Sequence, residues 1–428
     1  MPTEASSTHD IRNRLTAAGY RLVQIDSPIG GDKSLRADAI AWANDAEGSL
    51  VPWAVVEVKN GAKTPQILVL QQLIRARDLL GTVDHYAVLN GQWYKADQGL
   101  RHLEPVDAPT PPEHGTGAFL SDRELATSLV LDRLAYDEQA HARAGGRDKH
   151  ALPVTDVFAE TLMPGIDVPG VGFVPVDPDV LWQARRDALV RWATRSDKGS
   201  YFTSEPAIAR AVAELAGNRI EGVVLDPFCG TGSFLWETLD RAKMHNRAAE
   251  FLGHEWDERL ADIAEQIGRT APMYARIEQC DSFSQPLPEC NLMVSAPPIG
   301  VRMTTPHRLS DGSSTKDVVA AAIDACVRAL RPDGRAVLHV PASFTYNTSS
   351  ANYRQFLATT YRVAAVIGLP SVSFAGTSLR STLLVIDKDA PGDSFVAQLG
   401  EDWMAQLSPG GAALEAALSH LDGSAAGA

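Results

Sequence analysis

Helical and strand-like segments alternate along residues 176–388, and this alternation restricts the fold more than any other feature of the sequence. Short apolar runs of the buried-strand kind end near residues 226, 256, 296, 344 and 387. Amphipathic stretches that suit helices lie between them. The pattern is typical of a doubly wound α/β sheet with helices on both faces. We therefore expect these residues to form one Rossmann-like domain.

Length and composition narrow the remaining choices. The chain has 428 residues, and at roughly 100–200 residues per domain this length suggests two or three domains. No apolar run is long enough to span a membrane and the N-terminus lacks a secretory signal, so we expect a cytoplasmic protein without a membrane span. The four cysteines form no C-x-x-C pair, which indicates neither a zinc site nor a disulfide framework. The net charge of −14 argues mildly against a protein that holds DNA by itself.

Three further segments flank the alternating region. Residues 1–104 have the pattern of a smaller α/β domain, with a helix at 64–81 and a hairpin turn at Asn90-Gly91. Residues 105–175 include PVDAPTPPEHGTG, and we expect a proline-rich linker that carries one helical segment. Residues 389–428 hold six acidic residues and no Lys or Arg, and this acidic, low-complexity tail is expected to fray.

A glycine-rich turn at residues 227–232 is the sharpest motif. It follows the strand-like run that ends at Asp226 and precedes a helix that begins near Ser233. Glycines let the backbone approach a ligand closely, and ligands of such sheets bind at the carboxyl ends of the strands. Glu255 ends the next strand, where a carboxylate can accept hydrogen bonds from ribose hydroxyls. These residues indicate a nucleotide-type ligand.

The segment from Asp226, Asp-Pro-x-x-Gly-Thr-Gly-Ser, resembles motif I of the DNA amino-methyltransferases, which bind S-adenosylmethionine. Lys198–Pro206, Gly253–Trp256 and Cys280–Ser282 resemble further cofactor segments of the N-6 adenine-specific family that includes type I modification subunits. The likeness covers about residues 180–388 and implies a class I methyltransferase sheet. It implies that the cofactor is bound by Tyr201, Phe202, Thr203, Asp226, Pro227, Gly230, Thr231, Gly232, Glu255 and Asp281.

The catalytic loop departs from this family. The loop normally reads Asn (or Asp, or Ser)-Pro-Pro-Tyr (or Phe), because a side-chain oxygen accepts the protons of the adenine amine and the aromatic ring stacks on the flipped base. Here Ala296 precedes Pro297 and Pro298, and Ile299 replaces the ring. Loss of one preorganised polar group commonly costs about 10²–10³ in rate, so we expect weak or no methyl transfer. Ser295 is an alternative acceptor, although strand alternation points it away from position 296.

A second group of charged residues lies in the amino-terminal domain. Asp38 lies on one predicted strand, and Glu57 and Lys59 share a face of the next because side chains alternate along a strand. Two carboxylates can hold Mg²⁺ while a lysine orients water. The order of Arg36-x-Asp38, Glu57-x-Lys59, a Gln-bearing helix and Asn90-Gly91 resembles PD-(D/E)xK nucleases and the amino-terminal domain of type I restriction subunits. This resemblance implies a restriction-endonuclease-like fold.

Taken together, these features predict a DNA adenine-N6 methyltransferase-like component of a restriction–modification or phage-defence system, with S-adenosylmethionine as cofactor. DNA is the expected partner, reached through a specificity or partner subunit, and the oligomeric state stays open. Two alternatives stay open as well: a non-catalytic subunit that senses the cofactor or acts as a scaffold, and a methyltransferase for a substrate other than DNA.

Overall fold

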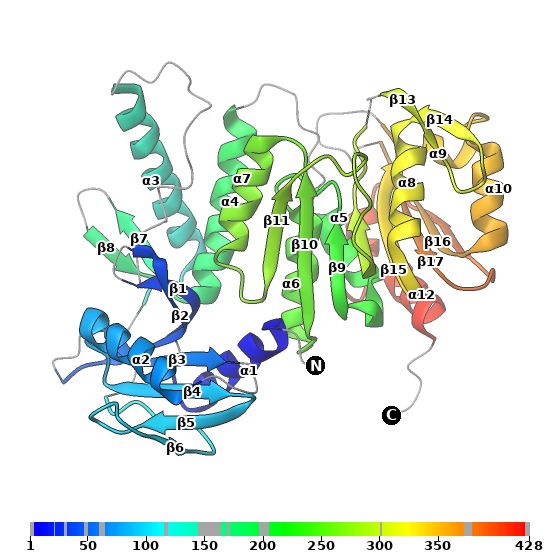
Figure 1. Ribbon diagram of the computed structural model, residues 1–428. Helices are drawn as coiled ribbons and strands as arrows, with labels where there is room; N and C mark the ends of the chain where they lie inside the picture. The colour runs from blue at the N-terminus through cyan, green and yellow to red at the C-terminus, as the bar shows by residue number, and fades with distance from the viewer. Residues whose placement is uncertain are drawn as a thin grey trace. The chain divides into compact units, whose positions relative to one another are not determined.

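The computed structural model describes residues 4–20, 22–29, 32–46, 50–59, 65–114, 119–143, 164–168, 172–196, 205–299, 302–371 and 379–423 (Figure 1). The chain divides into two compact units, Met1–Trp192 and Ala193–Ala428. None of the described helices is long and apolar enough to cross a lipid bilayer.

The first unit contains a six-stranded mixed sheet in the order β1-β2-β3-β4-β5-β6. Only β3 and β4 pair in parallel, and α2 connects them. The other neighbours are antiparallel. The elements are α1 (Glu4–Ala17), β1 (Leu22–Ile29), β2 (Asp32–Asn44), β3 (Leu50–Lys59), α2 (Gln66–Leu80), β4 (Asp84–Leu89), β5 (Gln92–Ala96) and β6 (Leu103–Pro105).

Each face of this sheet carries its own apolar core. Ala39 and Ala41 of β2 contribute to the core that holds Leu15 of α1, whereas Ile40 contributes to the core that holds Leu73 of α2. Period-two alternation explains this division, because successive strand residues point to opposite faces. The sheet is therefore covered by one helix on each side.

The predicted helix end and the predicted hairpin turn are both present in the first unit. Helix α2 ends at Gly81, whose φ of 70° places it in the left-handed region that a helix stop requires. Asn90 and Gly91 also have positive φ and form the two-residue turn between β4 and β5. The apolar face of α2 is narrower than its sequence suggests, because Ile67 is 64% exposed.

The rest of the first unit follows β6 in the chain. Residues 123–143 form the expected helix α3 (Arg123–Arg143). The expected linker over residues 105–175 also contains an antiparallel hairpin of β7 (Gly165–Val168) and β8 (Gly172–Pro175). Helix α4 (Pro178–Ser196) then leads toward the second unit in the chain.

The second unit contains an eight-stranded sheet in the order β11-β10-β9-β12-β15-β17-β16-β18. Strand β17 runs antiparallel to both of its neighbours, and the remaining pairs are parallel. The strands are β9 (Gly222–Asp226), β10 (Ala249–Glu255), β11 (Ala275–Gln279), β12 (Cys290–Ser295), β15 (Leu330–Pro341), β16 (Arg362–Leu369), β17 (Ser381–Asp387) and β18 (Phe395–Gln398).

Helices connect the strands of this sheet as the alternating pattern predicts. They are α5 (Pro206–Leu215), α6 (Ser233–Met244), α7 (Glu258–Gly268), α8 (Val318–Ala329), α9 (Ser343–Tyr346) and α10 (Ala351–Thr360), with a 3-10 turn at Gly217–Arg219. Helix α8 is buried along almost its whole length because alanines and branched aliphatic residues cover it on all sides. The antiparallel pair β13 (Arg302–Arg308) and β14 (Ser314–Asp317), which no sequence signal indicated, follows the catalytic loop.

The expected fraying of the acidic tail is wrong for residues 389–423. Strand β18 extends the sheet beside β16, and α11 (Trp403–Gln406) and α12 (Ala412–Asp422) follow. Trp403 and Leu414 are fully buried. These apolar side chains supply the folding energy that acidic composition alone does not reveal.

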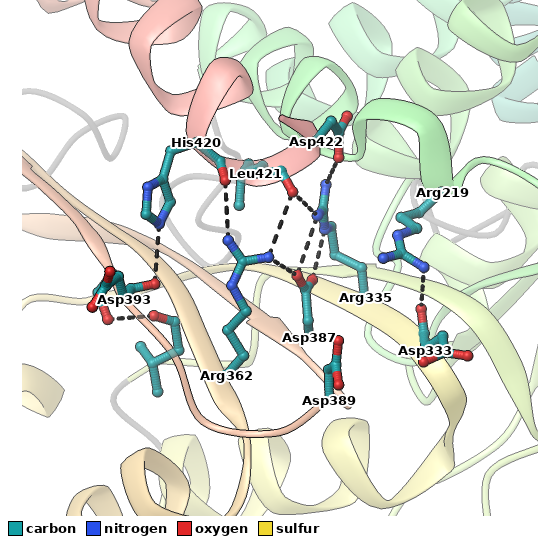
Figure 2. A network of polar contacts seen from close by, with 12 residues as sticks. Arg219, Asp333, Arg335, Arg362, Asp387, Asp389, Asp393, His420, Leu421 and Asp422 are labelled. Carbon is teal, nitrogen blue, oxygen red and sulfur yellow. Dashed lines mark hydrogen bonds and ion pairs between the residues drawn. The ribbon is translucent and has the colours of Figure 1, made fainter. Parts of the chain in front are cut away.

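A buried polar network fixes the end of α12 (Figure 2). The Arg335 side chain, 0% exposed, donates to both carboxylate oxygens of Asp387 at 2.7 and 3.2 Å and to Asp422 at 3.0 Å. Arg362 also donates to Asp387, at 3.2 Å, and to the His420 carbonyl at 3.0 Å. Cations at a helix C-terminus are favoured because the last carbonyls carry partial negative charge.

Candidate functional site

The glycine-rich loop at the end of β9 has the geometry that a close ligand requires. Gly230 and Gly232 have φ of 57° and 88°, and both values lie in the left-handed region that favours glycine. A Cβ atom on Gly230 would meet nothing within 4 Å, whereas one on Gly232 would lie 2.2 Å from Nε1 of Trp236. The same Trp236 nitrogen donates to the Thr231 carbonyl at 2.8 Å, which fixes the entry into α6.

Glu255 connects this loop to the neighbouring strand. One of its carboxylate oxygens accepts from the Gly230 backbone N–H at 2.8 Å, and the other accepts from the Asp257 N–H at 2.9 Å. Burial raises the pKa of Glu255, while these two N–H donors oppose that rise. Each carboxylate oxygen has a second lone pair, so Glu255 keeps acceptor capacity for a ligand.

Asp226 connects the loop to the strand that carries the catalytic segment. Its Oδ1 atom accepts from the Ser295 hydroxyl at 2.7 Å and from the Phe228 N–H at 3.1 Å. Burial raises the pKa of Asp226 to about 7, although both donors act in the opposite direction. The carboxyl ends of β9 and β12 are therefore bonded to each other through side chains.

The catalytic loop continues directly from Ser295. The Ser295 side chain is fully buried against Asp226, so it points toward the glycine-rich loop and its hydroxyl hydrogen is committed there. Pro297 is buried, and Ala296, Pro298 and Ile299 are half-buried. Position 296 thus offers no side-chain acceptor, and its own backbone carbonyl is the acceptor that this residue retains.

The loop after β11 also joins the glycine-rich loop. The Ser282 hydroxyl donates to the Pro227 carbonyl at 2.6 Å, and Asp281 accepts from the Phe283 N–H at 2.9 Å. The rings of Phe228 and Phe283 lie with their centroids 5.3 Å apart. The predicted positions Pro227 and Asp281 therefore belong to adjoining loops.

The structure adds a residue that sequence reasoning did not assign. Trp256 directly follows Glu255 and is 73% exposed, which is unusual for so large an aromatic side chain. Its position after the acidic end of β10 was the available signal. The predicted residues Tyr201, Phe202 and Thr203 lie outside the described part of the chain.

The amino-terminal charged group converges as its sequence spacing predicts. Lys59 Nζ lies 3.1 Å from Glu57 Oε2 and 3.7 Å from Asp38 Oδ2. Asp38 also accepts from the Val58 backbone N–H at 2.6 Å, which ties β2 to β3. Glu57 is 3% exposed, and burial followed by repulsion from Asp38 raises its pKa to about 7. Carboxylate oxygens are ligands that magnesium prefers, and in this structure Lys59 pairs with both carboxylates.

The other expected members of that group are exposed residues or a residue of the hairpin turn. Gln71 and Gln72 are exposed on α2. Arg36 is an exposed residue of β2. The Asn90 backbone N–H donates to the Lys59 carbonyl at 3.1 Å, so the hairpin turn supports the end of β3.

Several solved structures of other proteins resemble this chain. A protein from Listeria monocytogenes, assigned to the class I S-adenosylmethionine-dependent methyltransferases, matches with a TM-score of 0.54 and 14% identity over 70% of this chain and 99% of that one. A type I modification subunit from Vibrio vulnificus matches at 0.46 with 19% identity, over 53% of each chain. One from Streptococcus thermophilus matches at 0.46 with 17% identity, over 54% of this chain and 53% of that one.

The chain thus spans about half the length of the modification subunits that it matches. No curated protein sequence matches it. The Listeria likeness shows a class I methyltransferase fold. The family model for N-6 DNA methylase matches residues 185–403, which is half of the chain, and the chain therefore belongs to the N-6 DNA methylase family.

Proposed function

We propose that the second unit binds S-adenosylmethionine and serves as the modification component of a restriction–modification or phage-defence system that acts on adenine N6 in DNA. The observation that carries this proposal is the 2.7 Å hydrogen bond from Ser295 to Asp226. It holds the catalytic loop against the glycine-rich loop, so a methyl donor on one loop would face a base on the other. Family membership agrees with this assignment.

The residues present suit S-adenosylmethionine, which supplies the methyl group when bound. Gly230 leaves open space where a side chain would otherwise stand, so the loop backbone can approach the ligand. Glu255 offers acceptor capacity for ribose hydroxyls at the end of β10. The exposed ring of Trp256 is available to pack on a purine.

Methyl transfer is weak or absent in this proposal because of the catalytic loop. An exocyclic amine is a poor nucleophile, and the Ala296 carbonyl alone must accept its protons. Ile299 can pack on one face of a base but cannot stack on it as a ring does. A subunit that senses the cofactor or acts as a scaffold is then the alternative, and so is a methyltransferase for a non-DNA substrate.

Two measurements test the proposal. Isothermal titration of the full chain with S-adenosylmethionine should show one binding site, and no binding would defeat both the enzyme and the sensor versions. Modified-base sequencing of host DNA with and without the gene should show no new N6-methyladenine motif. A new motif that depends on the gene would overturn our interpretation of Ala296.

Restoration of the family residues is the sharper experiment. Ala296→Asn with Ile299→Phe should raise methyl transfer to adenine in DNA by about 10²-fold or more, since one preorganised polar group is worth that much. The exposed residue Ala351 provides a matched control, and Ala351→Asn should change nothing. An unchanged rate in the double variant, with cofactor binding intact, would contradict the proposed role of the loop.

The partner is inferred from the net charge of the chain. With a net charge of −14, the chain has no overall attraction to phosphates. We infer that it reaches DNA through a specificity or partner subunit. Gel filtration of the chain with duplex DNA, alone and with candidate subunits encoded beside its gene, tests whether a partner is needed. Tight binding of DNA by the chain alone at physiological salt would contradict this inference.

We also propose a magnesium-dependent nuclease-type site in the first unit. The convergence of Asp38, Glu57 and Lys59 within 3.7 Å supports it. The two carboxylates would hold the ion, and Lys59 would stabilise negative charge on a phosphate. Supercoiled plasmid should be nicked in Mg²⁺, and Lys59→Ala should abolish nicking while Arg101→Ala, an exposed turn substitution, should not. Nicking that survives Lys59→Ala would refute this assignment.

A further inference from the structure

Three side chains with metal-binding atoms meet on one face of β10 and β11. His254 of β10 and Glu278 of β11 are direct partners in the parallel register. Cys280 follows Glu278 by two residues, and its backbone N–H continues the pairing by donating to the Glu255 carbonyl at 2.9 Å. The ligand atoms of the three side chains all lie within 4.8 Å of one another.

The three side chains of this cluster differ in their exposure to solvent. His254 is 5% exposed, and a neutral imidazole has one ring nitrogen with a lone pair for a metal ion. The Ser282 hydroxyl, which donates to the Pro227 carbonyl, lies 3.5 Å from Nδ1 and helps to orient the ring. The Glu278 side chain is 39% exposed, so an ion can enter from solvent.

A hollow of about 320 Å³ opens beside the cluster. His254 and Glu278 line it together with Gln285 and Pro286 from the following loop. This space provides room for a water molecule as a fourth ligand.

We propose that His254, Glu278 and Cys280 bind a single zinc ion, with a water in the fourth position facing the hollow. One imidazole nitrogen, one thiolate sulfur and one carboxylate oxygen form a ligand set that zinc accepts in tetrahedral sites with an open position. A thiolate and an imidazole are poor ligands for magnesium and calcium, which prefer oxygen. The proposal does not rest on cofactor binding, because strand alternation directs Glu255 to the opposite face from His254, although Cys280 adjoins the predicted cofactor residue Asp281.

Arg276 is the nearest competitor for the ion. Its guanidinium pairs with one Glu278 oxygen at 2.7 Å, and the second oxygen remains to bind metal. A positive charge this close opposes a dication, so its removal should strengthen metal binding. This gives the proposal a gain-of-affinity test that an unfolded variant cannot imitate.

The experiment uses the full chain, stripped of metal by a chelator and titrated with Co²⁺ and then Zn²⁺. One equivalent of Co²⁺ should bind and show a thiolate-to-cobalt charge-transfer band in the near ultraviolet, and Zn²⁺ should displace it. Cys280→Ser should abolish the band, and Glu278→Gln should weaken Zn²⁺ binding by more than the roughly 10–100-fold that loss of an outer partner costs. Arg276→Gln should tighten Zn²⁺ binding.

Controls separate the site from general metal affinity. Glu265→Gln removes an exposed carboxylate of α7 that pairs with Arg269, and it should leave Zn²⁺ binding unchanged. The proposal is overturned if the full chain binds no stoichiometric Co²⁺ with a charge-transfer band, or if the band persists in Cys280→Ser. Weaker Zn²⁺ binding in Arg276→Gln would also overturn it.

Discussion

Replacement of Arg335 by methionine should destabilise the second unit far more than replacement of Arg362, although both arginines bind the same carboxylate. Arg335 is fully buried and holds Asp387 through two parallel hydrogen bonds, while a third reaches Asp422 of α12 (Figure 2). Arg362 is 22% exposed and contributes one hydrogen bond to Asp387. The comparison therefore isolates burial and bidentate geometry.

The magnitude follows from what each substitution leaves behind. Loss of one partner of a buried ion pair costs about 3–5 kcal/mol. Arg335→Met leaves Asp387 with Arg362 alone, so we expect the lower end, about 3 kcal/mol. Arg362→Met leaves the bidentate pair intact and removes the hydrogen bonds to Asp387 and to the His420 carbonyl, which at about 0.5–1 kcal/mol each should cost about 1–2 kcal/mol. For a unit of this size, about 2–4 °C is lost per kcal/mol, which predicts falls of about 6–12 °C for Arg335→Met and about 2–8 °C for Arg362→Met.

Differential scanning calorimetry of the full chain, with the transition of the second unit followed, measures both shifts. Arg219→Met is the matched control, because Arg219 is half-buried and donates to a backbone carbonyl, that of Asp333, rather than to a buried carboxylate (Figure 2). It should change stability by about 0.5 kcal/mol or less. Equal shifts for Arg335→Met and Arg362→Met would refute the reasoning from burial.

Three further predictions concern the glycine-rich loop. The pKa of Asp226 is about 7 in the folded state, against an ordinary 3.8. Between these pH values the folded state keeps a proton that the unfolded state releases, so the free energy of unfolding falls as pH rises. The stability of Asp226→Asn relative to the natural chain should therefore increase by about 4 kcal/mol across this pH range. Trp256→Ala should weaken S-adenosylmethionine binding by about tenfold or more, since loss of a stacking aromatic ring costs about 1–3 kcal/mol, whereas Trp256→Phe should keep most of the affinity and remove the fluorescence change that binding causes. Gly232→Ala should lower the melting temperature more than Gly230→Ala, because only at 232 does a Cβ collide with Trp236.

Each of these has a clear contrary outcome. Urea unfolding measures the stability of Asp226→Asn and of the natural chain at several pH values. If the difference between the two does not change with pH, Asp226 ionises normally. Unchanged fluorescence quenching in Trp256→Phe would place the ligand elsewhere. Equal melting temperatures for the two glycine variants would show that the loop relaxes around the added methyl group.

The sequence predicted the parts of the fold that local patterns determine. Strands β9, β10 and β12 were recognisable because each is a short apolar run between helical segments, and Glu57 and Lys59 share a face because a strand alternates. The folded end of the chain was not recognisable. It has six acidic residues and no Lys or Arg, whereas its stability depends on Trp403 and on the pairing of Asp422 with an arginine far away in the sequence.

The candidate sites also contain residues that the sequence predicts and contacts that it does not. Asp226 and Glu255 follow from the order of strands and turns, but the bond from Ser295 to Asp226 depends on two strands being neighbours in the sheet. The cluster of His254, Glu278 and Cys280 depends on the register of β10 with β11. A search for closely spaced cysteines cannot detect it, because its ligands come from two strands separated by α7.

The Arg335 network also sets the order in which the second unit can be completed during synthesis. Asp387 follows Arg335 by 52 residues and Asp422 follows it by 87. At about 5–20 residues per second, a ribosome makes Asp422 roughly 4–17 s after Arg335. Until then the guanidinium must stay hydrated, since a buried charge without its partners is costly. Strand β15 therefore presents an unpaired edge until β17, which carries Asp387, has been synthesised.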